Sequence, residues 1–242
     1  REGEIAIIDL TKTSNNLRYF TLYNPSYTEG VSTGEVVGGD ALEWDLSGET
    51  VVYDANNEVP LSGFGTYNYW DMGLLNAWNK KANTFGDGKI EKIFTGLEEG
   101  ENIGNPSFSK NTPYILSFDY VLDNNGNGEL DDTDDYEVLT TNIETGDIGT
   151  VFENATLGFP NYSTKDDFII FDAQSNAGDD VLAIAPLKTD KLTPNSDPSI
   201  FKSGYILGTW FANGQRVLSS NRDEAWPEAN IKVYPNPFGD QT

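Results

Sequence analysis

One short unit recurs along this chain and limits the folds that it can adopt. The unit is an aromatic residue, a polar turn and then three or four residues typical of a β-strand. Its aromatics are Trp44, Phe108, Tyr162 and Trp210, so successive copies begin 64, 54 and 48 residues apart. A repeat of four strands takes roughly 40–45 residues, and longer loops account for the surplus. The spacing therefore predicts successive sheets of one design.

Segments rich in β-branched and aromatic residues occur throughout the chain. Gly, Asn, Asp and Pro separate them, and these residues favour turns. The clearest strand segments are 4–9, 17–23, 50–53, 114–120, 168–171 and 180–187. Segment 74–82 is the one stretch whose sequence is compatible with a helix, and strand-like sequence flanks it. The chain is therefore expected to be all-β.

The recurring unit resembles the TolB-type, WD-like β-propeller repeat, whose signature is Pro-x-Trp-Ser-Pro-Asp-Gly before a buried strand. Segments 44–48 and 210–214 keep the aromatic and the closing Gly, while 108–109 and 162–163 keep the aromatic–Ser step. No copy carries the whole signature. The resemblance covers about residues 1–219 and implies a β-propeller. A β-sandwich with recurrent aromatic strands is the alternative.

The phase of the repeat divides this region into blades. Residues 1–35 supply the last two strands of a blade, and 205–219 supply the first two strands of another. Three full blades lie between them, at about 36–100, 101–157 and 158–204. An open edge invites aggregation, so we expect some closure. The two half-blades either close a ring of four or belong to a larger propeller. The first residue, Arg rather than Met, favours the second alternative.

The composition changes after residue 219. Residues 220–230 are polar, as expected for a linker, and 231–242 contain the run Val-Tyr-Pro-Asn-Pro-Phe. This run closely resembles the start of the type A C-terminal sorting domain of the type IX secretion system, truncated here after its first dozen residues. The resemblance implies type IX secretion machinery as a partner and an exported bacterial protein, secreted or held on the outer cell surface. It also implies a signal peptide earlier in the precursor.

The charge and the missing residue types exclude several functions. The chain of 242 residues has 15 Lys and Arg against 39 Asp and Glu, a net charge of −24. Such a chain repels nucleic acid and anionic lipid. Its longest apolar runs, such as 181–187, are too short for membrane insertion. Without His or Cys, the chain can form no Ser-His-Asp triad, Cys nucleophile, His-bound zinc or disulfide.

Residues 123–134, with the sequence DNNGNGELDDTD, have the spacing of a calcium-binding loop. Ca²⁺ prefers six to eight oxygen ligands, and a Gly at the sixth position permits the sharp turn. The expected ligands are Asp123, Asn125, Asn127, Glu129 through its backbone carbonyl, Asp131 through water, and Asp134. The loop resembles a dockerin-type loop more than an EF-hand, which ends in Glu, and strands are predicted on both sides. The alternative is a solvated acidic turn.

These features favour a non-enzymatic, calcium-stabilised binding or scaffold module whose partner is a protein or a glycan. The alternative is a carboxylate-dependent glycosidase, which needs only two acids, or an accessory domain of a secreted hydrolase with its catalytic domain upstream. The acids considered for catalysis are Asp71, Glu98, Glu99, Asp166, Asp167, Asp179 and Asp180. None stands out from the other acids. The aromatics of the repeat are expected in the core, whereas Trp70 and Trp78 are candidate ligand contacts.

Overall fold

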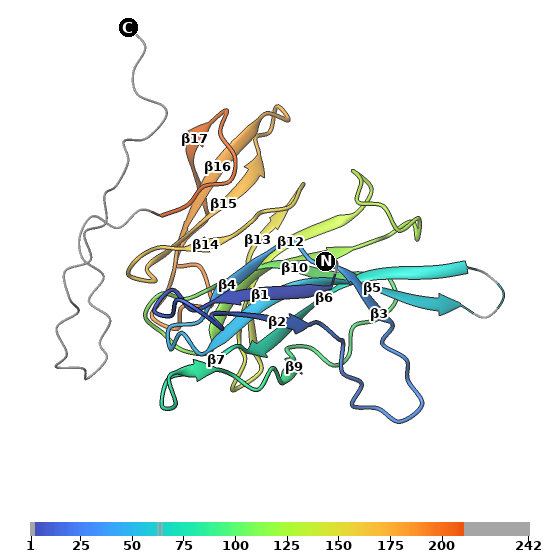
Figure 1. Ribbon diagram of the computed structural model, residues 1–242. Helices are drawn as coiled ribbons and strands as arrows, with labels where there is room; N and C mark the ends of the chain where they lie inside the picture. The colour runs from blue at the N-terminus through green and yellow to red at the C-terminus, as the bar shows by residue number, and fades with distance from the viewer. Residues whose placement is uncertain (1–2, 62, 64, 211–242) are drawn as a thin grey trace, which may run out of the picture. The chain divides into compact units, whose positions relative to one another are not determined.

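The computed structural model describes residues 3–61, 63 and 65–210, and every regular element in these ranges is a strand (Figure 1). The prediction of an all-β chain is therefore confirmed for this part. Segment 74–82 contains the end of one strand, a second short strand and a turn, and no helix. The predicted linker, the sorting-domain sequence and residues 211–219 lie outside the described residues.

The chain begins with an N-terminal hairpin of β1 (Glu4–Ile8) and β2 (Leu17–Thr21), which pair antiparallel. The first sheet follows and has five strands. It comprises β3 (Glu35–Gly38), β4 (Leu42–Trp44), β5 (Thr50–Leu61), β6 (Gly65–Asn76) and β9 (Ile90–Lys92). A small hairpin of β7 (Trp78–Asn79) and β8 (Thr84–Phe85) lies between β6 and β9 in the sequence.

The second and third sheets each contain four antiparallel strands in sequence order. The second sheet comprises β10 (Glu101–Phe108), β11 (Ile115–Leu122), β12 (Asp135–Asn142) and β13 (Asp147–Asn154). The third comprises β14 (Asn161–Tyr162), β15 (Phe168–Gln174), β16 (Asp180–Pro186) and β17 (Ser199–Ser203). These three sheets fall within the three predicted blade segments. All sheets in the described part are open, with free edges.

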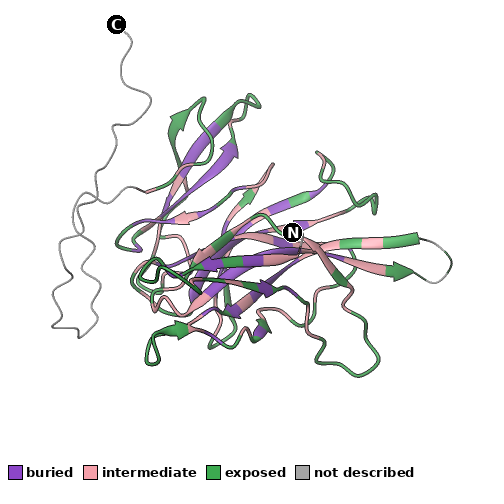
Figure 2. Ribbon diagram, in the orientation of Figure 1, coloured by how far each residue is buried: buried purple, intermediate pink, exposed green. Residues whose placement is uncertain are grey.

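Strand alternation lets one sheet contribute to two cores, because successive side chains point to opposite faces. In β5, Val51 packs with the N-terminal hairpin, while Val52 packs with the second sheet. In β11, Leu116 joins the core shared with the first sheet, while Ile115 joins the core shared with the third. Figure 2 shows the resulting buried runs along the central strands.

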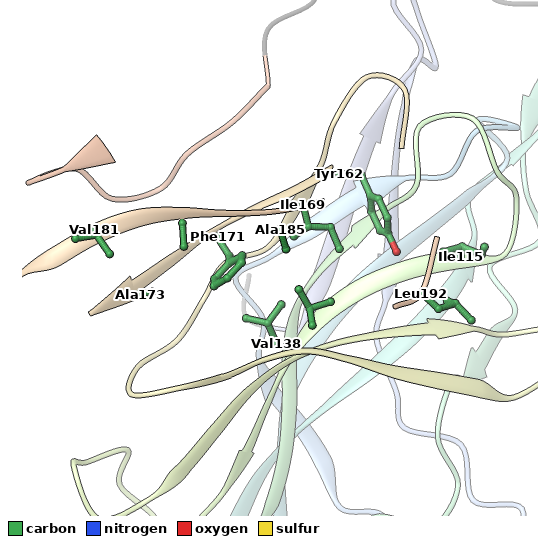
Figure 3. Packing of buried hydrophobic residues seen from close by; sticks show 11 residues of the cluster. Ile115, Val138, Tyr162, Ile169, Phe171, Ala173, Val181, Ala185 and Leu192 are labelled. Carbon is green, nitrogen blue, oxygen red and sulfur yellow. The ribbon is translucent and has the colours of Figure 1, made fainter. Parts of the chain in front are cut away.

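The core between the second and third sheets is the largest of the three buried clusters (Figure 3). Val138 from β12 meets Ile169 and Phe171 from β15, and all three are fully buried. Tyr162 lies in the same cluster, with its hydroxyl donating to the carbonyl of Lys191 at 2.8 Å. Strands from two consecutive sheets therefore share one apolar interior.

The recurring aromatics occupy the same position in each sheet. Each of Trp44, Phe108 and Tyr162 is the last residue of its strand and pairs with the next strand along the chain. Trp44 of β4 pairs with Val51, Phe108 of β10 with Leu116, and Tyr162 of β14 with Ile169. The next residue's N–H, from Asp45, Ser109 or Ser163, closes the turn by donating to Thr50, Ile115 or Phe168 at 2.9 Å. The aromatic–polar step of the sequence therefore marks one local structure.

Burial of these aromatics differs from the prediction that all lie in the core. Phe108 and Tyr162 are buried, but Trp44 is 37% exposed and Trp210 is half-buried. The prediction is wrong for Trp44. The N-terminal hairpin that precedes it contributes only two strands, and their buried side chains pack with β5, β6 and Ile90. Among the described residues, no sheet covers Trp44 in the way that the first and second sheets cover Phe108 and Tyr162.

Candidate functional site

The predicted calcium loop connects β11 to β12, so strands flank it as expected. Residues 123–134 are mostly exposed, and Asp134 at the end of the loop is buried. Asn125, Asn127 and Asp131 each accept the N–H of the residue two positions on, at 2.9, 2.7 and 2.8 Å. These Asx turns are a local property of Asn and Asp side chains. They fix the side chains of Asn125, Asn127 and Asp131.

Some of the predicted ligands converge and others hold the backbone. Asp131 Oδ2 accepts the side-chain amides of Asn125 and Asn127 at 3.1 and 2.9 Å. Asp123 accepts the N–H groups of Gly126 and Gly128, both with positive φ, at 2.6 and 2.8 Å. The structure thus brings together Asn125, Asn127 and Asp131, while Asp123 closes the first turn of the loop.

The remaining predicted ligands lie at the C-terminal part of the loop. Asp134 accepts the N–H groups of Asn124 and Asp131 at 3.3 and 3.0 Å, and Glu129 is exposed. Hydrogen bonds from Thr133 and from the side chain of Asn127 lower the pKa of Asp131 to about 2. The side-chain oxygen donors of this loop fit the chemistry of a hard cation. In the part of the chain that the structure describes, no three carboxylates form a ready metal cage.

A set of buried aspartates that hold the backbone was not predicted from the sequence. In each sheet, the strand that follows the repeat aromatic contains one buried aspartate: Asp54 in β5, Asp119 in β11 and Asp172 in β15. These residues follow the repeat aromatics by 54 − 44 = 10, 119 − 108 = 11 and 172 − 162 = 10 positions. This regular offset is the sequence signal that identifies them.

Each buried aspartate accepts backbone N–H groups from the segment that leads to the next aromatic. Asp54 accepts the N–H of Asn105 at 3.0 Å, and Asp119 accepts that of Phe159 at 2.9 Å. Both oxygens of Asp172 accept the N–H of Leu207, at 2.8 and 2.9 Å. The donors stand three residues before Phe108, Tyr162 and Trp210, and all have positive φ, at 52°, 45° and 56°. We call these contacts the aspartate clamps.

Asp119 makes the most complete of the aspartate clamps. Besides Phe159, it accepts the N–H of Gly158 at 2.8 Å and the side chain of Asn105 at 2.9 Å. Burial raises the pKa of Asp119 to about 6, although these three donors act in the opposite direction. Gly158 is required by the close approach, since a Cβ there would lie 2.5 Å from Cγ2 of Val138. The clamp therefore joins the second sheet to the segment that leads into the third sheet.

The acids considered for glycosidase chemistry either hold other parts of the fold or stand exposed on the surface. Asp71 is buried and pairs with Lys92 at 2.9 Å. Asp166 accepts the N–H groups of Lys110 and Asn111, and Asp167 accepts the hydroxyl of Ser163 at 2.6 Å. Glu98, Glu99, Asp179 and Asp180 are exposed. The arrangement gives no support to a pair of catalytic carboxylates.

The tryptophans considered as ligand contacts, Trp70 and Trp78, are both half-buried. The backbone N–H of Trp70 donates to Asn102 of the second sheet at 2.9 Å. Trp78 packs edge-on against Phe85 within the small β7–β8 hairpin, at 5.4 Å between ring centroids. The Trp78 ring therefore has a local packing role, and the backbone of Trp70 is joined to the second sheet.

Comparison with protein-family models and with curated proteins finds no match to this chain. Among residues 3–61, 63 and 65–210 there is no helix long and apolar enough to cross a bilayer. The fold and the candidate sites therefore have to be interpreted from their own geometry.

Proposed function

We propose that this chain is a calcium-stabilised binding or scaffold module built from propeller blades and exported by a bacterium. The observation that carries the proposal is the repeated construction of the three sheets. Each has its aromatic at the same position, and an aspartate clamp reaches toward the next unit. A role in binding rather than catalysis is favoured because the buried carboxylates of the clamps hold the backbone.

The packing of the sheets supports the propeller part of the proposal. Consecutive sheets share cores through opposite faces of their central strands. Blades of a propeller are antiparallel four-stranded sheets of this size. The N-terminal hairpin supplies two strands, which fits a blade completed by other strands, either from 205–219 or from a larger parent protein.

Calcium is the proposed resident cation of loop 123–134. The Asx turns at Asn125, Asn127 and Asp131 hold alternating oxygen donors along one loop. Extracellular modules bind Ca²⁺ with dissociation constants of about 10⁻⁴ to 10⁻³ M. Saturation at about ten times Kd would stabilise the folded state by about 1.4 kcal/mol.

The calcium part is tested by thermal unfolding of the chain with millimolar calcium and with a chelator. We expect a higher melting temperature with calcium. Magnesium serves as the control, because its smaller ion prefers a rigid octahedral site. Identical melting curves with calcium and with the chelator would show that the loop is only an acidic turn.

Export rests on the sequence of 231–242, which resembles a type IX sorting domain. Deleting 231–242 and everything after it from the precursor should leave the protein in the periplasm of a host with type IX machinery. Deletion of the polar segment 220–230 alone is the control and should preserve export. Normal surface delivery without 231–242 would refute this part of the proposal.

A further inference from the structure

A groove with a volume of about 360 Å³ lies beside the long β5–β6 hairpin. Its walls come from the loop 25–33, the outer ends of β5 and β6, and the segment 92–99. β5 and β6 have 12 residues each, and only their inner parts pair with β3, β4 or β9. Ligand sites are typically concave spaces of about 300–1,000 Å³. The extension of this hairpin therefore creates a space of ligand size.

Two tyrosines of β6 form a fixed aromatic wall in the groove. The rings of Tyr67 and Tyr69 are stacked, with 6.0 Å between centroids and 16° between planes. The hydroxyl of Tyr67 accepts the N–H of Gly100 at 2.8 Å. The hydroxyl of Tyr69 donates to the carbonyl of Thr33 at 3.0 Å and accepts from Asn24 at 2.9 Å. Rings held in this way lose little conformational entropy when a ligand binds.

The groove carries an excess of negative charge. Lys92 is the one cation among the described residues that line the groove. It pairs with Asp71 at 2.9 Å, and both side chains are nearly buried, so this pair is neutral within the protein. Glu98 and Glu99 stand exposed on the rim, and no ion pair in the described residues involves them. Two carboxylates thus remain available to a ligand.

A buried acceptor without a hydrogen-bond partner among the described residues lies in a second cavity next to the groove. A much smaller cavity shares Pro25 and Lys92 with the groove and is lined by Asn57 and Asp71. The side-chain oxygen of Asn57 is fully buried and has no hydrogen-bond partner within the described ranges. Its amide nitrogen already donates to the carbonyls of Ala55 and Tyr69. An acceptor remains unpaired there.

We propose that this groove binds a basic peptide segment, with an Arg or Lys side chain lying over Tyr67 and Tyr69 and its charge close to Glu98 and Glu99. The inference names a ligand class for the proposed binding function and rests on it. Cations are attracted to the faces of Tyr rings. The chain's net charge of −24 also attracts basic ligands over longer distances and repels acidic ones.

The test measures binding of acetyl-Gly-Arg-Gly-Arg-Gly-amide by calorimetry, with a matched peptide in which citrulline replaces arginine. Citrulline keeps the shape of arginine and lacks its charge. We expect the arginine peptide to bind about tenfold more tightly. Its affinity should fall between about 50 and 300 mM salt, since exposed charges are screened.

Variants locate the binding to the groove. The double variant Glu98→Gln/Glu99→Gln should weaken binding of the arginine peptide about fivefold or more. The matched control, Glu144→Gln/Asp197→Asn, removes two exposed acids elsewhere and should leave the affinity unchanged. Tyr67→Phe keeps the ring and should keep binding, whereas Tyr67→Ala should lose it. Near-ultraviolet circular dichroism checks that each variant is folded.

Equal affinity for the arginine and citrulline peptides would overturn the proposal, as would equal binding by both double variants. Binding of cellotetraose without binding of the arginine peptide would assign the groove to neutral glycans instead. No binding of either probe at about 1 mM would refute this site. The calcium and export experiments test the proposed function independently, so the two failures are distinguishable.

Discussion

Asp119 shows how a single buried carboxylate can join two sheets. It accepts two backbone N–H groups from the segment that leads into the third sheet, and one side-chain amide from Asn105 of the neighbouring strand β10. Asp119→Ala would leave these buried donors unpaired, and we expect a loss of about 3 kcal/mol in the free energy of unfolding. Chemical denaturation measures it. Asp197→Ala, at an exposed position, is the control and should change it by less than about 0.5 kcal/mol.

Asp119 should also make the free energy of unfolding depend on pH. The pKa of Asp119 is raised by burial from 3.8 to about 6 in the folded chain. Its protonation therefore favours the folded state below about pH 4, and this contribution is lost as the pH rises through 6. Titration of the carboxyl carbon by NMR should give a midpoint near 6 for Asp119. A midpoint at or below the ordinary value of 3.8 would contradict this prediction.

The repeat aromatics should differ in their contribution to stability. Tyr162 is fully buried between two sheets and donates to Lys191, so Tyr162→Ala should cost about 3–5 kcal/mol. Trp44 occupies the same position in the first sheet but is 37% exposed. Trp44→Ala should therefore cost clearly less, as measured by chemical denaturation of both variants. Equal losses would mean that Trp44 is covered in solution.

At the scale of elements, loop 123–134 is a short insertion between two strands that pair along their whole length. Its shape comes from Asx turns and two glycines with positive φ. Because these bonds are local, the loop can bind an ion without changing the register of β11 and β12. Its variants should consequently alter calcium affinity more than the fold.

Two substitutions in this loop should act in opposite directions. Asp123→Ala removes a carboxylate that closes the first turn, and calcium should then no longer raise the melting temperature. Asn127→Asp adds a charged ligand and should increase calcium affinity several-fold, since affinity follows the number of charged ligands. Calorimetric titration of both variants and the parent chain checks this. An unchanged affinity in Asn127→Asp would place position 127 outside the ion's coordination.

At the scale of the whole molecule, the described strands form consecutive units that share cores with their neighbours. In such an array each unit is stabilised mainly by those beside it. The polar segment 220–230 and the sequence after it are predicted to lie outside this array.

A chain that ends at residue 219 should therefore keep the unfolding free energy of the full chain within about 0.5 kcal/mol. Urea denaturation of the two chains makes the comparison. A chain that ends at residue 206 is the contrasting variant, because it removes Leu207, the donor to Asp172, and the indole of Trp210, which donates to Asn161. We expect this shorter chain to be destabilised. A large loss on removing only 220–242 would show that the tail belongs to the folded array.

The sequence by itself determined the all-β class, the positions of β1, β2, β11, β15, β16 and the start of β5, and the position of the loop between β11 and β12. These features depend on neighbouring residues: period-two alternation, turn residues, and the aromatic–polar step that closes the same turn at Trp44, Phe108 and Tyr162. Only the tertiary structure decided the exposure of Trp44, the partners of the aspartate clamps and the groove beside Tyr67. These depend on contacts between residues that are distant in the sequence. The sequence alone does not show whether an Asp in a strand faces water or a backbone N–H of the next sheet. Only the packing of the sheets distinguishes these two environments.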